Sequence, residues 1–560
     1  MRAIAITIHN FRTFAHAELR LSPYSLLVGA NNTGKSNLIE AIRVFYEKDI
    51  KYEEGRDFPK FPTVDKESWI EIQFEPSPAE FALLKDEYRL PDGTFRVRKY
   101  LQSSETDDEG NPKNGIYAYV GGTLSNSRFY GAKNVQQGKF GEVIHIPSVS
   151  KLDEHTKLTG PSALRDLINN VLKKIMGSSP AYTALKSAFD DFESALKTET
   201  TPDGQSLQKL ESEISAEINE WGTSFELFVT PIAPDELVKN LVGHGIKDHT
   251  LGQTQDTKSY GQGFQRHLIF TLIRLAARYN APPAVSTTKK DFSPRLTWIL
   301  FEEPEAFLHP SQIDALNASM GKIAADEGSQ ILITTHNPQF VSRNIEDLPS
   351  LARLCKTGAQ STIKQVSNAA LQSILATNQQ DLAKWQAASI QIEPDDFQVD
   401  MESVKYALWL NPLRCSAFFA NRILLVEGAT EAALIGYMLN EGQIPNPSGG
   451  VFVFDAIGKY NIHRFMNLFG EFGIPHAVLY DHDSGKPTGI PIETTIQASQ
   501  NACTIGIDHF GQDLETYLGI PPAGRHDRKP QHVMWHFKQG KIDSAKLSGL
   551  AGKIRALLKI

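Results

Sequence analysis

The stretch RILLVEGATEAAL at residues 422–434 and the stretch AVLYDHDSG at residues 477–485 each have the pattern of a buried strand ending on acidic side chains. Glu427 and Glu431 follow the first strand, and Asp481 and Asp483 follow the second. Ligand sites in α/β proteins lie at the carboxyl ends of parallel strands. Because Mg²⁺ takes oxygen ligands in proteins, these two strands predict a parallel sheet with a divalent-metal site at its edge.

The four carboxylates are expected to converge. Glu431 lies one helical turn after Glu427, and alternation in an extended segment points Asp481 and Asp483 to the same side. Four crowded acids repel one another, and one or two Mg²⁺ or Mn²⁺ ions would relieve that repulsion. Two such ions can clamp the attacking and leaving oxygens of a phosphodiester. The alternative is that these are surface acids capping helices, since Thr430 and Glu431 begin a helix and acids are common there.

A second motif lies far upstream, where GANNTGKS at residues 29–36 matches the phosphate-binding pattern GxxxxGK[ST]. It stands between an apolar strand, SLLV, and a helical segment, NLIEAIRVFYE. In such a loop the glycines let backbone N–H groups surround a phosphate, the lysine meets the β/γ oxygens, and the serine ligates Mg²⁺. The sequence therefore predicts an ATP site formed by Gly29, Asn31, Asn32, Gly34, Lys35 and Ser36.

Two later strands are expected to complete this nucleotide site. WILF at residues 298–301 leads into Glu302, a candidate Mg²⁺ ligand, and Glu303, a candidate for polarising the attacking water. A strand at residues 331–335 leads to His336, a candidate hydrogen-bond donor to the γ-phosphate. The alternatives are two surface glutamates and a structural histidine. The order and spacing behind a phosphate loop favour the catalytic interpretation.

A glycine-rich turn, SYGQGFQR at residues 259–266, opens a helical segment. Helix N-termini bind anions, so Ser259, Gly261 and Gly263 are candidates for a second phosphate contact. With a phosphate loop already present, this turn suggests the reciprocal half of a composite site between two subunits. The alternative is a simple helix start with flexible glycines.

The composition is that of an ordinary globular protein, with 560 residues, 41% of them hydrophobic and 22% charged. The length predicts several domains. No apolar run approaches the roughly 18–20 residues that cross a bilayer, and the chain starts in strand-like alternation rather than a signal peptide. Three scattered cysteines favour a reducing compartment. We therefore expect a cytoplasmic protein that does not contact a membrane.

The charge is unevenly distributed. The whole chain carries −8, but residues 521–560 hold nine Lys/Arg against two Asp, a balance of +7, which leaves −15 elsewhere. A basic tail behind an acidic metal site suits a phosphate backbone, so DNA is the expected partner. A solvated basic helix is the alternative.

The nucleotide motifs, with EEPEAFLHP at residues 302–310, resemble ATPases of the ABC/SMC/RecF class, in which two heads sandwich ATP. The resemblance covers roughly residues 1–355 without a helical insertion. It departs at the signature, where the class has LSGGQ and this chain has SYGQGFQR. It implies dimerisation through the ATPase heads.

Periodicity and motifs together predict an α/β protein: an ABC/SMC/RecF-like ATPase head with a helical insertion, followed by an α/β domain with a parallel sheet. Residues 1–160 form the first ATPase part and residues 161–228 the insertion, a candidate dimerisation arm or an ordinary packed hairpin. Residues 229–368 form the second ATPase part, residues 369–420 a helical connector, and residues 421–560 the domain with the four acids.

The pattern E-G-x-T-E at residues 427–431, followed by D-x-D at residues 481–483, resembles the Toprim domain. After an ABC-like ATPase it resembles the OLD (overcoming lysogenization defect) family of ATP-dependent endonucleases, to which the nuclease subunit of the Gabija anti-phage system is related. The resemblance implies cleavage of DNA with Mg²⁺ or Mn²⁺, regulation by ATP, dimers or tetramers, and a role in anti-phage defence, with a partner protein in some systems.

The same resemblance implies two more kinds of site residue. The family tends to place another acidic ligand where this chain has DLETY at residues 513–517, which favours Glu515. It also uses a lysine near the C-terminus beside the scissile phosphate. Lys529, Lys538 and Lys541 are candidates, with Lys529 and Lys541 preferred, because a cation there neutralises charge on the transition state.

Two other functions are compatible with these motifs. Toprim domains also occur in strand-passing and priming machines, but a topoisomerase needs a tyrosine nucleophile in a further DNA-binding module. Only some 77 residues follow Asp483, which is short for one. The other alternative is an ATP-switched sensor or scaffold that acts only with a partner protein.

Overall fold

The computed structural model describes residues 1–47, 50–131 without 109, 140–148, scattered positions between 156 and 195, 199–227, 243–280 without 251 and 257–258, 292–447 without 293 and 307, 450–482 and 489–560. The chain divides into one unit made of Met1–Ser148 and Thr288–Ile560 and a second unit, Val149–Thr287.

The first unit begins with an antiparallel sheet in the order β2-β1-β4-β5-β6-β7. Apolar side chains alternate along its long strands, and one side of the sheet is buried, as expected for a sheet with one solvated face. The strands are β1 (Arg2–Phe11), β2 (Phe14–Arg20), β4 (Ser68–Glu75), β5 (Phe95–Gln102), β6 (Gly115–Val120) and β7 (Thr123–Arg128). Two short helices accompany them, α2 (Glu54–Asp57) and α3 (Pro78–Leu83).

A second six-stranded sheet, in the order β14-β13-β3-β12-β11-β8, carries the nucleotide motifs. Its strands are β3 (Tyr24–Val28), β8 (Glu142–Ile146), β11 (Thr297–Glu302), β12 (Ser329–Thr334), β13 (Leu351–Thr357) and β14 (Gln360–Lys364). All neighbours are parallel except β13 and β14. Their near-continuous apolar sequences fit a sheet covered on both faces. Parallel pairing brings the ends of β3, β11 and β12 to one edge.

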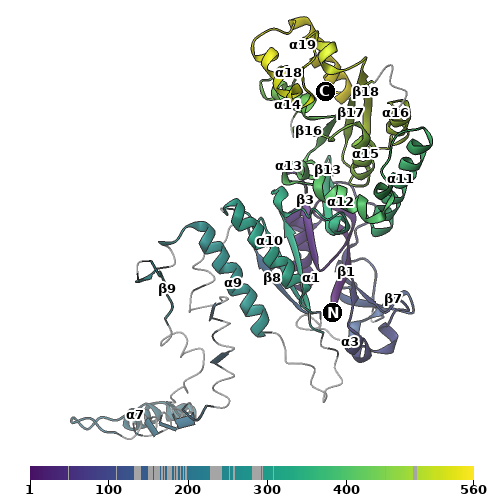
Figure 1. Cartoon of the computed structure of the whole chain (residues 1–560). Coiled ribbons are helices and arrows are strands. Elements are labelled where there is room, and N and C mark those ends of the chain that lie inside the picture. The colour runs from purple at the N-terminus through teal and green to yellow at the C-terminus, as the bar shows by residue number, and fades with distance from the viewer. Residues whose placement is uncertain are drawn as a thin grey trace. The chain divides into compact units, whose positions relative to one another are not determined.

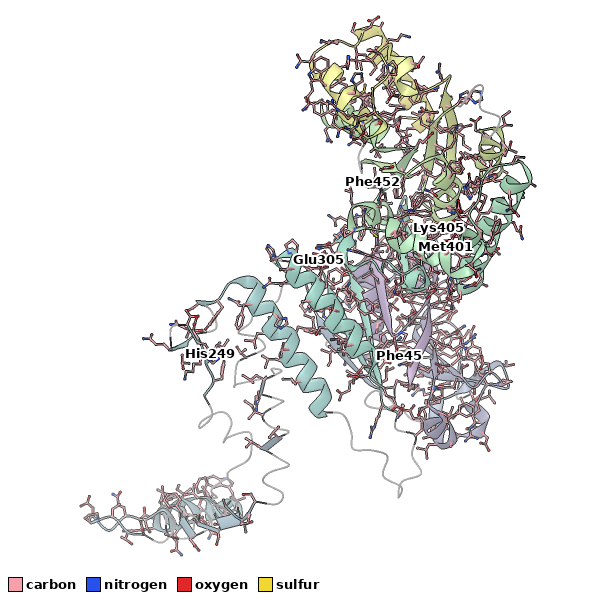
Figure 2. The ribbon with its side chains drawn as sticks, viewed as in Figure 1. Phe45, His249, Glu305, Met401, Lys405 and Phe452 are labelled. Atoms are coloured by element: carbon pink, nitrogen blue, oxygen red, sulfur yellow. The ribbon has the colours of Figure 1, made fainter. Side chains whose placement is uncertain are left out.

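Helix α1 (Lys35–Tyr46) packs against β1 and β8, and helix α10 (Pro310–Ala325) packs against β12 and β3 (Figure 1). The buried face of α1 includes Leu38, Ile42 and Phe45, spaced as an amphipathic helix requires. Phe45, labelled in Figure 2, belongs to the core cluster that also contains residues of both sheets. The phosphate loop is therefore attached to a rigid helix start.

The C-terminal part of the same unit is a four-stranded parallel sheet in the order β16-β15-β17-β18. Its strands are β15 (Arg422–Val426), β16 (Val451–Asp455), β17 (His476–Asp481) and β18 (Thr504–Phe510). Figure 1 shows helices α14 (Ala429–Asn440), α18 (Lys529–Lys538) and α19 (Ser544–Leu558) on one side of this sheet, and α15 (Ile462–Glu471) and α16 (Gly489–Ala498) on the other. Helix α17 (Leu514–Leu518) contacts α19. This is the parallel α/β sheet that the two acidic strands predicted.

Between the two parallel sheets, the chain forms α11 (Asn368–Ala387), α12 (Val399–Trp409) and α13 (Pro412–Cys415). Helix α11 contacts α15 and α16, while α12 and α13 contact short turns that follow β12. The connector is thus helical, and it packs on both neighbours.

In the second unit the described elements are α7 (Leu207–Ile218), α9 (Gln262–Asn280) and a small antiparallel pair, β9 (Ile246–Lys247) with β10 (Thr254–Gln255). The domain boundaries expected from the sequence stay a prediction. Across the described part of the chain, none of the helices combines the length and the apolar composition required to span a bilayer.

Candidate functional site

The loop after β3 has backbone geometry that only glycine adopts without strain at two positions. Gly29 has φ +144°, and a Cβ there would lie 2.5 Å from the carbonyl oxygen of Leu354. Gly34 has φ +101°, and its Cβ would lie 2.8 Å from Ser361 Oγ. Asn32 also has a positive φ, 63°, which asparagine tolerates. These constraints shape the loop that precedes α1, and Asn31 belongs to the same loop.

Lys35 reaches back into the loop. Its ammonium group donates hydrogen bonds to the carbonyl oxygens of Gly29 at 2.9 Å and Ala30 at 3.0 Å. Burial lowers the pKa of Lys35 to about 8, against the opposing effect of Glu303 and Glu305. A bound phosphate would replace the carbonyls as the partner of this cation.

Glu302 lies at the end of β11 between two side chains. The hydroxyl of Ser36 donates to one carboxylate oxygen at 2.8 Å, and His145 Nε2 lies 2.8 Å from the other. Burial acts to raise the pKa of Glu302, but the hydrogen bonds from His145 and Ser36 outweigh it and hold that pKa below its ordinary value. The two predicted Mg²⁺ ligands, Ser36 and Glu302, are thus adjacent, and the lowered pKa of Glu302 favours its ionised carboxylate.

Glu303 and His336 face each other beside this pair. His336 Nε2 lies 3.6 Å from a Glu303 carboxylate oxygen, and Glu303 has a positive φ of 46°. Burial, with the charge of Lys35, lowers the pKa of His336, so the imidazole is neutral. The structure brings both predicted catalytic groups to the carboxyl ends of β11 and β12.

Glu305, labelled in Figure 2, is a further acid at this edge. It accepts hydrogen bonds from the Thr335 hydroxyl at 2.7 Å and from the His336 N–H at 2.8 Å. Burial raises the pKa of Glu305, and its Oε2 is buried without a hydrogen-bond partner among the described residues. Sequence reasoning missed the roles of His145, which lies on β8, and of Glu305, which lies in the stretch EEPEAFLHP.

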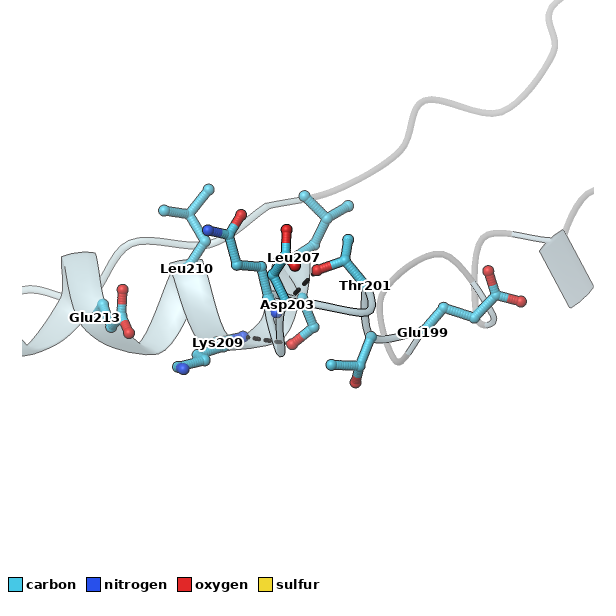
Figure 3. A pocket seen from close by; sticks show the side chains of 10 residues that line it. Glu199, Thr201, Asp203, Leu207, Lys209, Leu210 and Glu213 are labelled. Carbon is cyan, nitrogen blue, oxygen red and sulfur yellow. Dashed lines mark hydrogen bonds between the residues drawn. The ribbon is translucent and has the colours of Figure 1, made fainter.

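The signature residues belong to the second unit. Ser259 and Gly261 precede α9, and Gly263 lies in its first turn. Gly261 accepts the first hydrogen bond of the helix, from the Gln265 N–H at 3.2 Å. Their contact with phosphate stays a prediction. A pocket of about 700 Å³ also lies in this unit, around the start of α7 (Figure 3). Its lining is mostly polar and includes none of the predicted site residues, so we assign it no role.

In the C-terminal sheet, parallel pairing of β15 with β17 brings together acids that are 54 positions apart. Val426 pairs with Leu479, and the N–H of Asp481 donates to Glu427 Oε2 at 3.3 Å. Glu431 is buried and also accepts from the Gly428 N–H at 3.1 Å. Glu431 therefore caps the start of α14, which is the alternative considered from the sequence. It is also buried beside the other acids.

The crowding of these acids changes their protonation. Burial, followed by the charges of Glu427 and Glu515, raises the pKa of Glu431 to about 7. Burial, followed by the charges of Glu431 and Glu427, raises the pKa of Asp481 to about 8. Asp483, the fourth predicted ligand, lies outside the described residues.

Glu515 and Lys529 complete this cluster. Glu515, on α17, is buried, and its Oε1 lies 3.3 Å from the ammonium of Lys529 at the start of α18. The charge of Lys529 also opposes the upward shift of the Asp481 pKa. Lys541 instead lies 4.0 Å from the centre of the Trp535 ring, and Lys538 lies 5.5 Å from that of Tyr437. Of the candidate lysines, Lys529 has a described contact with the cluster.

The donor set fits a hard divalent cation. Asp481 Oδ1 is buried without a hydrogen-bond partner among the described residues, and all the predicted ligands are carboxylates, which Mg²⁺ and Mn²⁺ accept. Within the described ranges, which exclude Asp483, no three Asp, Glu, His or Cys side chains are spaced to enclose a metal ion.

Comparisons with known proteins match two parts of the chain to known domain families. Residues 1–341 match the AAA ATPase domain family, and residues 418–483 match the overcoming lysogenization defect protein-like TOPRIM domain. An ATPase domain implies nucleotide binding, and a TOPRIM domain implies the use of a divalent metal.

Three curated relatives share both parts. The chain is 23% identical over 502 residues to Old nuclease of Escherichia phage P2, covering 86% of this chain and 77% of that protein. It is 22% identical to endonuclease GajA of Bacillus cereus, with 87% and 76% covered, and 19% identical to OLD nuclease of Thermus scotoductus, with 85% and 81% covered. With an ATPase match over more than half its length, the chain belongs to the AAA ATPase domain family, and over most of its length it is similar to proteins named Old nuclease and OLD nuclease.

Proposed function

We propose that this nuclease is an ATP-regulated DNA endonuclease that depends on Mg²⁺ or Mn²⁺. The observation that carries the proposal is the partly buried acidic cluster of Glu427, Glu431, Asp481 and Glu515 with Lys529 beside it. Crowded carboxylates with an adjacent cation are suited to a metal and a phosphodiester together.

Glu427, Glu431, Asp481, Asp483 and Glu515 would hold the metal, which when bound supplies positive charge for the attacking and leaving oxygens. Lys529, held at 3.3 Å from Glu515, would neutralise the charge that develops on the scissile phosphate. The basic tail behind this site would contact the DNA backbone.

The nucleotide site would act as the regulator. Lys35 and Ser36 would bind ATP with Mg²⁺, Glu302 would share that ion, Glu303 would orient the attacking water, and His336 would donate to the γ-phosphate. Ser259, Gly261 and Gly263 would contact the ATP bound by a second subunit. The active form would therefore be a homodimer, or a tetramer that also uses the helical insertion as a contact. The curated relatives include an Old nuclease of a phage and a GajA endonuclease. We propose that this protein acts in the cytoplasm in defence against phage, either alone or together with a partner protein.

A plasmid assay tests the proposal. Supercoiled plasmid is incubated with the protein and each divalent metal in turn, with and without ATP. The wild type is expected to nick or linearise the plasmid with Mg²⁺ or Mn²⁺, and ATP is expected to change the rate. The double variant Glu427→Ala with Asp481→Ala is expected to lose cleavage while hydrolysing ATP at the wild-type rate, because the two sites use different residues.

A matched control is Asp508→Asn, an acid on β18 that pairs with Lys553 at 2.6 Å rather than with the cluster. This variant should cut like the wild type. If the double variant still nicks plasmid, the acidic cluster is not the cleavage site. If the wild type fails to cut plasmid with every metal tested, the proposed function is wrong.

A further inference from the structure

Ile457 is held in a conformation that a β-branched residue rarely adopts. It lies two residues after the end of β16 and has φ +59°. Isoleucine in this left-handed region is strained, because its branched side chain crowds the backbone. Its side chain is 41% exposed, so burial of apolar surface does not explain why the strain is kept.

The surrounding side chains impose this conformation. Asp455 Oδ1 accepts from the Ile457 N–H at 2.8 Å, and the Asn461 amide donates to the Ile457 carbonyl oxygen at 3.0 Å. Asp455 is itself held by Arg414, whose guanidinium donates to the Asp455 carbonyl at 3.1 Å and to its carboxylate at 3.2 Å. Three polar side chains thus hold one exposed isoleucine in place.

The strained turn lies directly beside the acidic cluster. The Ala456 N–H donates to the Val426 carbonyl at 3.0 Å, and the Gly458 N–H donates to the Glu427 carbonyl at 2.7 Å. Ile457 is the residue between these two bonds. One turn further on, Tyr460 is 45% exposed, with its ring 5.7 Å from that of Trp385 in an edge-to-face arrangement.

We propose that Ile457, with Tyr460 beside it, contacts the bases of the strand whose phosphodiester lies at Glu427 and Asp481. This inference rests on the proposed function, since it assigns the occupant of the same edge. Apolar side chains that proteins present to nucleic acid insert between base steps, and aromatic rings stack on bases regardless of sequence. Backbone strain retained next to reacting groups fits a side chain that must be aimed at a ligand.

The test separates strain from function with two substitutions. Ile457→Gly and Ile457→Asn both suit a positive φ, and both remove the apolar side chain. Each variant is expected to melt about 1–3 °C above the wild type, because the strain is relieved. Each is also expected to bind a fluorescent DNA oligonucleotide about tenfold more weakly in Ca²⁺ and to cleave it correspondingly more slowly in Mg²⁺ or Mn²⁺.

The matched control is Leu408→Asn on α12, which replaces another apolar side chain that is 73% exposed and should leave DNA binding unchanged. Wild-type DNA affinity in both Ile457 variants overturns the inference, whether their melting temperature rises or falls. Loss of self-association with unchanged DNA affinity also overturns it, since Ile457 would then contact a second copy of the chain. The binding assay in Ca²⁺ is judged independently of cleavage, so a wild type that never cuts refutes the proposed function without deciding this inference.

Discussion

Lys529 and Lys541 differ in their surroundings although only twelve positions separate them. Lys529 begins α18 and contacts Glu515, and the charges of Glu515 and Asp481 help to raise its pKa. A lysine that stays charged beside acids is suited to stabilising phosphate charge. Lys541 follows the same helix and packs over the exposed ring of Trp535, where a cation–π contact accounts for its position.

We therefore predict that Lys529→Ala lowers the rate of plasmid nicking on the order of 10²–10³-fold, whereas Lys541→Ala changes it by less than about threefold. The rates are measured at saturating metal, so that a changed metal affinity does not dominate. Lys529→Arg is the conservative comparison and should recover part of the rate. Equal losses in the two alanine variants would show that Lys541 also reaches the phosphate.

At the scale of elements, the parallel pairing of β15 with β17 places carboxylates in one partly buried volume. Helix α14 starts immediately after Gly428 and turns Glu431 back over its own first turn. The ordinary pKa values of Glu431 and Asp481 are 4.5 and 3.8, and in the folded protein they are raised to about 7 and about 8. The folded state therefore binds protons more tightly than the unfolded chain does.

The sign of the pH dependence follows. A raised carboxyl pKa contributes stability that is fully present below the unfolded value, near 4, and is lost as pH rises through 7–8. We predict that the metal-free protein is destabilised between pH 6 and pH 8.5 by these two groups. Saturating Mg²⁺ should raise the melting temperature more at pH 8.5 than at pH 6, because metal and protons compete for the same oxygens.

Thermal melts at both pH values, with EDTA or with Mg²⁺, check this prediction. Asp481→Asn removes one of the two titrating groups and should flatten the pH dependence of the metal-free protein. The prediction is contradicted if Mg²⁺ raises the melting temperature equally at both pH values and the metal-free wild type has the same melting temperature at pH 6 and pH 8.5.

At the scale of the whole unit, Arg353 connects the ATPase sheet with the TOPRIM sheet. It lies on β13, and its buried guanidinium donates to the carbonyls of Phe418 at 3.2 Å, Ala420 at 2.8 Å and Gly473 at 3.1 Å. The next residue, Leu354, is the one whose carbonyl closely approaches Gly29 of the phosphate loop. A single strand thus contacts both the nucleotide loop and the segments that lead into β15 and β17.

We predict that Arg353→Met lowers the free energy of unfolding by more than about 2 kcal/mol, since it leaves several buried carbonyls without a donor. If ATP regulates cleavage as proposed, the ratio of cleavage rates with and without ATP should also move toward one. Arg422→Met is the control, because Arg422 donates to the Leu558 carbonyl at 2.6 Å inside the TOPRIM domain alone. Arg422→Met should lower the stability while preserving the effect of ATP on cleavage. If Arg353→Met also preserves the effect of ATP, Arg353 does not couple the two sites.

The local sequence determined the parts of this protein whose chemistry lies within a few consecutive residues. The phosphate loop is predictable from sequence because Gly29 and Gly34 supply positive φ where the loop needs it. Glu427 and Asp481 are predictable because each stands at the end of an apolar strand, and Glu431 because it lies one helical turn after Glu427. Strand type and order then predict a parallel sheet with acids at one edge. The fold and the two kinds of site follow from those stretches.

Only the tertiary structure determined which groups from distant parts of the sequence are in contact and which are buried. His145 and Glu302 are 157 positions apart, and Arg353 and Gly473 are 120 apart, so no local spacing indicates either contact. The contact of Lys529 with Glu515 depends on elements from elsewhere in the chain, as do the raised pKa values of Glu431 and Asp481. So does the burial of Glu305 Oε2, which has no hydrogen-bond partner within the described ranges. Desolvation and charge crowding are properties of the packed protein, which is why these features appear only once it is folded.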